Sequence, residues 1–349
     1  NAGTNVSTSY RSIIIGPYAG DAITTTPGVI LIGYAAGGAI NHSDAQYTIA
    51  IGHSAGAAIT SGRYQTLVGY RAGVSITEGD SNTLIGYDTG DALTTGLDNV
   101  AMGQNALGAN QTGQRSVAIG NYALYSSTTS GWTKNTAVGA NALSSIVSTT
   151  GNTGIGYHAG YSSVLGAENT LVGAEAGYYL VGSDSVHIGF QTGYYATGSY
   201  NTFVGHSAGK GGNTSAPFSS GPNNTAIGVQ ALTAFTTAED NTALGMFAGR
   251  ALTTGNSNTL LGNGAGDTMT ATSNTVLIGV TAGGAINSTD ANGTVAIGYS
   301  AGLTLTDGQY NTLVGYQAGD GLTTGNDNTI IGYVAGGSTD FNAGTANTF

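Results

Sequence analysis

Apolar and polar residues alternate along the chain in short blocks that recur at a nearly fixed spacing. Each block resembles Asn-Thr-x-Ile-Gly-x-x-Ala-Gly, and its first glycine recurs 19 times from Gly16 to Gly332, mostly 17 residues apart. The residue before this glycine is Ile or Val in 16 of the 19 copies, and β-branched residues favour strands. The pattern therefore predicts one short strand per repeat, with the β-branched residue on its inward face.

The expected interior of each repeat is narrow. Alanine stands three residues after the glycine in 17 of 19 copies, which indicates a position closely approached by neighbouring backbone. One further Ile, Leu or Val completes the inward set. The β-branched residues of the predicted coil core are Ile15, Ile32, Ile51, Val68, Ile85, Ile119, Val138, Ile155, Val172, Ile188, Val204, Ile227, Ile278, Ile297, Val314 and Ile331.

The 17-residue period determines the predicted architecture. It is too short for helix-pair repeats or propeller blades and suits two short strands and two turns, which make one coil of a parallel β-solenoid. We therefore predict an all-β chain with a single repetitive domain over residues 1–349 and about 19 coils. Because each coil buries little, lateral association of several copies is expected to supplement the core.

Composition narrows the class of protein. Only 7% of the residues are charged, the formal net charge is −11, and the chain has no Cys but 60 Gly. A nucleic-acid backbone would be repelled, thiolate metal sites and disulfides are excluded, and the most apolar stretch, residues 29–40, is too short to span a bilayer. The expected surface is polar and neutral, which is typical of extracellular β-fibres.

Several repeats resemble a known family. Val117-Ala118-Ile119-Gly120 and Asn224-Thr225-Ala226-Ile227-Gly228 are similar to the head repeats of YadA-like trimeric adhesins. The longer unit at residues 311–319, followed by Leu-Thr-Thr-Gly, resembles the β-roll shafts of phage tail fibres. The resemblance implies a left-handed β-roll assembled as a trimer, on a virion tail fibre or a bacterial cell surface. The 17-residue period departs from the shorter unit of the adhesin heads.

A second, longer repeat relates the two ends of the chain. Five coil glycines starting at Gly16 recur 246 residues later, starting at Gly262. Local duplication of coils within one solenoid explains this. The alternatives are a window of a longer fibre built from large modules and a subunit whose ends imitate each other. We expect at least one end to stack on another module or subunit.

Tyrosines form the first candidate contact surface. Tyr161, Tyr178 and Tyr194 share one coil position in three successive repeats, and Tyr179 and Tyr195 extend the set. In a solenoid they would form a ladder with a step of about 4.8 Å. Such a ladder either stabilises the solenoid by stacking or presents an aromatic strip on which glycan rings can pack.

Two insertions interrupt the period and form the second candidate surface. Residues 125–134 contain the only tryptophan, Trp132, and residues 210–224 contain Phe218. In repeat proteins insertions map to protruding loops, which often bind partners. Packing over the solenoid flank or between protomers is the alternative.

Polar residues give little sign of catalysis or metal binding. Turn preference explains the acidic residues Asp80, Asp98, Asp184, Asp240 and Asp327 without a function. The sequence predicts no enzyme and no cofactor, and calcium at stacked turns is the one metal left open. None of the five His has a zinc-type spacing, and His53 and His206 occupy the position after the glycine where other coils carry Tyr. We interpret these two as surface substitutes for Tyr.

The leading functional hypothesis is an extracellular structural and adhesive fibre segment. It would attach to surfaces by many weak contacts and assemble with itself, as a homotrimer or end to end. Its other expected partner is a cell-surface glycan or protein, with no nucleic acid and no membrane insertion. The alternatives are a polysaccharide-degrading tailspike-like enzyme and an ice- or mineral-binding solenoid that uses the strand-start threonines Thr83, Thr136, Thr242 and Thr312.

Overall fold

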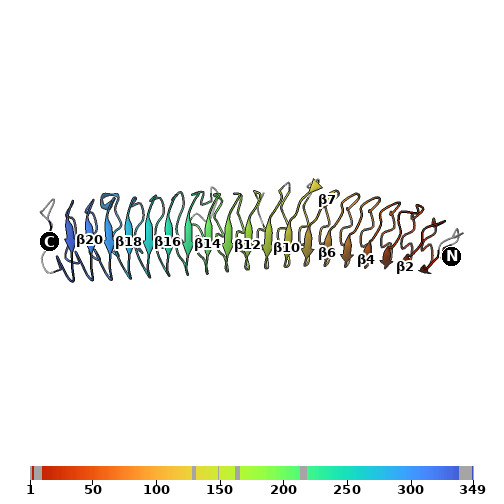
Figure 1. The fold of residues 1–349 in the computed structure, drawn as a ribbon, viewed down its shortest axis with the longest axis horizontal. Coiled ribbons are helices and arrows are strands. Elements are labelled where there is room, and N and C mark those ends of the chain that lie inside the picture. Colours follow the sequence, from red (N-terminus) through yellow and green to blue (C-terminus); the bar gives the residue numbers. More distant parts are fainter. Residues whose placement is uncertain are drawn as a thin grey trace. The chain divides into compact units, whose positions relative to one another are not determined.

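The chain is all-β and forms a parallel β-solenoid of about 18 turns, as the 17-residue period predicts. The computed structural model describes residues 2–3, 10–127, 131–147, 149–161, 166–212, 218–337 and 348. Contacts divide the chain into two compact units, Asn1–Leu171 and Val172–Phe349. Within each unit the main strands run side by side in one direction (Figure 1).

Most strands have three residues, and one such strand belongs to each turn. In the first unit and at its boundary they are β1 (Ile13–Ile15), β2 (Ile30–Ile32), β3 (Ile49–Ile51), β4 (Thr66–Val68), β5 (Thr83–Ile85), β6 (Val100–Met102), β8 (Val117–Ile119), β10 (Thr136–Val138), β11 (Thr153–Ile155) and β12 (Thr170–Val172). In the second unit they are β13 (Val186–Ile188), β14 (Thr202–Val204), β15 (Thr225–Ile227), β16 (Thr242–Leu244), β17 (Thr259–Leu261), β18 (Val276–Ile278), β19 (Val295–Ile297), β20 (Thr312–Val314) and β21 (Thr329–Ile331).

Three smaller elements depart from this regular pattern. The two-residue strands β7 (Gly113–Gln114) and β9 (Gly131–Trp132) pair in parallel in the first unit. In the second unit a short 3₁₀ helix, η1, covers Thr289–Ala291 in the turn between β18 and β19. Strand β9 lies near the end of the first predicted insertion, so its pairing with β7 ties part of that insertion to the preceding coil.

Successive strands pair in exact repeat register. In β4 and β5, Thr66 lies opposite Thr83 and Val68 opposite Ile85. The same relation holds in the second unit, where Thr242 of β16 lies opposite Thr259 of β17. Each coil position therefore becomes a row of equivalent side chains along the unit.

The predicted inward face of the strands is wrong. The central residue of each strand points inward, as Leu67 and Leu84 do with no exposed surface, whereas the residue before the glycine points outward. Side chains alternate along a strand, so the first and third residues share the outer face. The half-buried residues of the predicted core are Ile32, Ile51, Val68, Ile85, Val138, Val172, Val204, Ile278, Ile297 and Val314, and the exposed ones are Ile15, Ile119, Ile155, Ile188, Ile227 and Ile331.

The observed core combines three apolar rows. In the coil of β4 these are Leu67 at the strand centre, Ala72 in the turn and Ile76 on the returning segment, all fully buried. The alanine position is buried, which fits its predicted role as a place of close approach. The further Ile, Leu or Val of each repeat is confirmed as an inward residue by Ile76 and by Leu93 of the next coil.

A buried row of asparagines forms a polar seam inside each unit. Asn241 Nδ2 donates to the carbonyl of Gly255 at 2.9 Å, and its Oδ1 accepts from the backbone N–H of Asn258 at 3.0 Å and from Asn258 Nδ2 at 2.9 Å. Asn241 itself is 1% exposed. The Asn that starts most repeats is thus a hydrogen-bonded core residue that links neighbouring coils.

We expect Asn241→Leu to lower the free energy of unfolding by about 3 kcal/mol, because it leaves buried donors and acceptors of Gly255 and Asn258 unpaired. Asn241→Thr is the matched control, since Thr275 fills the same row and donates to Asn258 Oδ1 at 2.7 Å. Chemical denaturation followed by circular dichroism measures both. Equal losses for the two variants would contradict the hydrogen-bond explanation.

Candidate binding surfaces

The outer face of the strands is a continuous neutral surface within each unit. Strands β4 and β5 present Thr66 and Thr83 in one row and Val68 and Ile85 in a second row, all partly exposed. In the second unit, Leu244 is 43% exposed at the same position. No charged side chain occupies the first or third position of any three-residue strand in the described ranges. This face offers apolar and hydroxyl groups without electrostatic repulsion.

A second row of side chains follows the strand glycine. Tyr34, His53, Tyr70 and Tyr87 stack in succession, with ring centroids 4.9, 5.3 and 5.1 Å apart. His53 is exposed within this stack, which confirms it as a surface substitute for Tyr. The same interpretation is confirmed for His206, which is exposed and lies 5.3 Å from Phe190 in the second unit.

The predicted tyrosine ladder and the second insertion come together in the second unit. The ring centroids of Tyr178 and Tyr194 lie 4.9 Å apart, and those of Tyr179 and Tyr195 lie 5.7 Å apart. Phe218 adds a fifth ring, 4.5 Å from Tyr179. All five are partly buried against one another. This packing favours the structural interpretation of the ladder and places Phe218 over the solenoid flank.

A polar chain borders this aromatic cluster. Lys210 Nζ donates to Gln191 Oε1 at 2.9 Å, and Gln191 Nε2 donates to Glu175 Oε2 at 2.8 Å. Burial, together with the negative charge of Glu175, raises the pKa of Tyr194 to about 12. The Tyr194 hydroxyl therefore stays protonated and neutral at physiological pH.

Tyr161 and Trp132 both lie in the first unit. The Tyr161 ring stacks on His158 with a centroid separation of 4.3 Å. Trp132 is 58% exposed on β9, with the Arg115 guanidinium 4.2 Å from its ring centre and Lys134 Nζ 5.4 Å from it. Of the two insertions, residues 128–130 and 213–217 lie outside the described residues.

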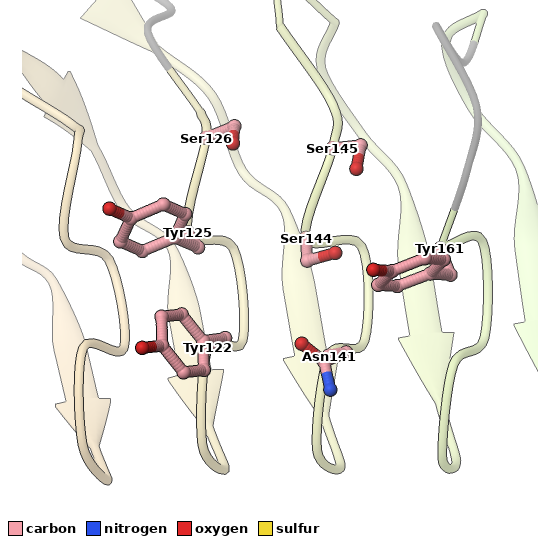
Figure 2. A pocket seen from close by; sticks show the side chains of 7 residues that line it. All are labelled: Tyr122, Tyr125, Ser126, Asn141, Ser144, Ser145 and Tyr161. Atoms are coloured by element: carbon pink, nitrogen blue, oxygen red, sulfur yellow. The ribbon is translucent and has the colours of Figure 1, made fainter.

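A hollow of about 320 Å³ opens on the first unit (Figure 2). It extends over the turns that follow β8, β10 and β11, and it is open to solvent. Tyr161 extends from one side towards Ser144, and Tyr122 and Tyr125 stand on the other side. The side chains that line it are Tyr122, Tyr125, Ser126, Asn141, Ser144, Ser145 and Tyr161, and none of them is charged.

The turn carboxylates pair with side chains one coil away. Asp80 accepts from Arg63 Nε at 3.1 Å, Asp98 lies 3.6 Å from Arg115 Nε, and Asp240 accepts from Asn223 Nδ2 at 3.1 Å. Within the described part of the chain, no group of three or more His, Asp or Glu side chains is placed to hold a metal ion.

Sequence reasoning missed one unusual core residue, His187. It fills the central position of β13, is fully buried, and neither ring nitrogen has a hydrogen-bond partner. Its ring stacks on Phe203 with centroids 5.0 Å apart. Burial lowers the pKa of His187 to about 3. The sequence does hold a signal for this residue. His187 stands two residues before the strand glycine, where most other coils carry Leu, Ala or Ile.

No protein-family model matches the chain, and no curated protein matches it significantly in sequence. Among the described residues there is no helix with the length and apolar character needed to cross a membrane. The resemblance to adhesin heads and tail-fibre shafts therefore stays a prediction.

Proposed function

We propose that the chain is a segment of an extracellular structural and adhesive fibre that associates with copies of itself and attaches to surfaces through many weak contacts. The observation that carries this proposal is the outer strand face, where Thr and Ile or Val rows repeat in register without charge. Apolar surface of this kind gains about 25 cal/mol for each Å² removed from water. A second copy of the chain carries the same rows, so its outer strand face can pack against this one and cover its apolar side chains.

The finer parts of this proposal rest on the sequence. The resemblance to adhesin heads favours three copies and a left-handed roll. The same resemblance, together with the low charge, favours a place on a virion tail fibre or a bacterial surface. Trp132, exposed between Arg115 and Lys134, is the proposed contact for a surface partner, and the tyrosine row after the strand glycine adds further aromatic area.

We expect the double variant Val68→Lys and Ile85→Lys to weaken self-association at least about tenfold, because each assembled copy would bury unpaired charges. The matched control is Tyr64→Lys with Ser81→Lys, at the left-handed turn position where Arg115 and Lys134 occur naturally. Light scattering over a dilution series, with circular dichroism to verify folding, measures the effect. A wild-type mass of 34.5 kDa at all concentrations would overturn the assembly proposal.

The same face supports a second candidate function, ice or mineral binding. The strand-start threonines are accessible, with Thr83 partly exposed and Thr242 exposed, and they lie in register between neighbouring coils. An in-register row of exposed hydroxyls can pair with an ordered water layer or a mineral surface. If the face is buried between copies of the chain, it cannot bind ice or mineral. Thermal hysteresis in a monomeric sample would therefore favour ice binding over the fibre proposal.

A further inference from the structure

The hollow on the first unit lies where a small residue stands between two coils that carry tyrosine at the same position. Five residues after the strand glycine, the coils of β8 and β11 carry Tyr125 and Tyr161, whereas the coil of β10 between them carries Ser144. Ser144 is 6% exposed and forms the floor (Figure 2). The missing ring leaves a depression between two coils that keep theirs.

The neighbouring tyrosines do not fill this space. Tyr125 leans towards the preceding coil, where a Cβ built on Gly108 would lie 2.8 Å from the Tyr125 ring. Its hydroxyl points away from Ser144 in Figure 2, and only Tyr161 extends towards Ser144. The depression therefore has the Tyr161 ring on one side and the coil that carries Tyr122 and Tyr125 on the other, and it is open to solvent.

Hydroxyl and amide groups supply the polar part of the lining. Ser126, Ser144 and Ser145 offer hydroxyls that both donate and accept, and Asn141 offers an amide. No carboxylate, ammonium or guanidinium group is among the lining residues. A ligand here meets apolar ring surface and neutral hydrogen-bonding groups, but no charge partner.

We infer that this hollow binds one neutral pyranose residue of a surface glycan. A pyranose has an apolar C–H face that packs on tyrosine and hydroxyls that pair with Ser and Asn. The volume of about 320 Å³ is at the lower limit of about 300–1,000 Å³ for small-molecule sites, which suits a single ring. The open top lets a polysaccharide continue beyond the site. The net charge of −11 disfavours acidic sugars.

The site deepens the proposed function, since attachment through it rests on the adhesive role. Its chemistry, however, is testable on the isolated chain. The probes are the methyl glycosides of glucose, galactose, mannose and N-acetylglucosamine, each titrated into the full chain and followed by saturation-transfer NMR. We expect at least one to bind with a dissociation constant of about 1 mM, the weak affinity usual for one small ring.

Ser144→Tyr is the decisive variant, because it places a ring in the hollow. We expect it to weaken glycoside binding at least about tenfold without lowering the melting temperature, since the added ring joins its neighbours. Thr233→Tyr is the matched control in the second unit, because Ala231-Leu232-Thr233 repeats the local sequence Ala142-Leu143-Ser144. The control should bind as the wild type does.

A second variant keeps the test independent of how Ser144→Tyr folds. Asn141→Ala removes the amide at a left-handed position where Ala35 occurs in another coil, with φ of 56° and 51°. We expect about fivefold weaker binding. Three results would overturn the pyranose site: no binding of any of the four glycosides, unchanged binding by Ser144→Tyr, or saturation transfer only to an aromatic probe such as Ac-Tyr-NH₂. Self-association without glycoside binding would overturn the pyranose site and leave the fibre proposal intact. Glycoside binding by a chain that stays monomeric would support the site and overturn the assembly proposal.

Discussion

Gly262→Ala is expected to destabilise the solenoid by at least about 3 kcal/mol, although it adds one methyl group. Gly262 has a φ of 139°, which L-residues rarely adopt, and a Cβ at this position would lie 2.6 Å from the carbonyl carbon of Gly279 in the next coil. Backbone strain and displacement of the neighbouring coil each cost about 1–3 kcal/mol. Thermal and chemical unfolding of the full chain measure the loss.

Gly264→Ala in the same turn is the control for this variant. Gly264 also has a positive φ, 63°, but the nearest side-chain atom to its Cβ would be Thr281 Cγ2 at 3.7 Å. Ala35 adopts the same conformation at the equivalent position of another coil. We expect a change within about 1 kcal/mol. Similar losses for the two variants would show that positive φ alone, and not the approach of the next coil, requires glycine.

Acid is expected to destabilise the second unit through His187. Its pKa is about 3 in the folded chain and about 6.5 in an unfolded one. Above pH 6.5 the imidazole is neutral in the folded and the unfolded chain, so protonation of His187 does not reduce the free energy of unfolding. As the pH falls from 6.5 to 3, the unfolded chain binds a proton that the folded chain excludes. Each pH unit then costs about 1.4 kcal/mol, which amounts to about 5 kcal/mol at pH 3.

His187→Leu should remove this part of the pH dependence. Leu67 and Leu277 occupy the same core position in other coils, and the substitution eliminates two buried nitrogens without partners. His53→Tyr, at an exposed stack position, is the control and should retain the wild-type acid sensitivity. Urea unfolding between pH 7 and pH 3 compares the three proteins. An unchanged slope for His187→Leu would contradict this account.

The strand phase shows how much the repeat could predict. Most strands have apolar residues at their second and third positions, and β-branched character alone places the third position in the interior. The threonine at the first position of most strands held the correct signal. It shares a face with the third residue, so a polar Thr facing outward places Val68 or Ile85 outward with it. The buried Asn before that Thr fits the same alternation.

The candidate sites depended more strongly on three-dimensional packing. The sequence identified the tyrosine ladder and Phe218 separately, but their contact joins residues about 40 positions apart. The hollow at Ser144 depends on the direction in which Tyr125 leans over Gly108. Neither property follows from composition or spacing, because side-chain direction is set by the packing of successive coils.

By itself, the sequence determined that this chain is a parallel β-solenoid with in-register coils, a small-residue turn and a nearly uncharged surface. These properties follow from a period of 17 residues in most coils, so local pattern and global fold agree. Only the tertiary structure decided that Asn forms a hydrogen-bonded core seam, that His187 is enclosed without a hydrogen-bond partner and that a hollow opens at Ser144. Each of these features depends on contacts between neighbouring coils. A repeat in the sequence places equivalent residues in register, but it does not determine the direction in which their side chains point.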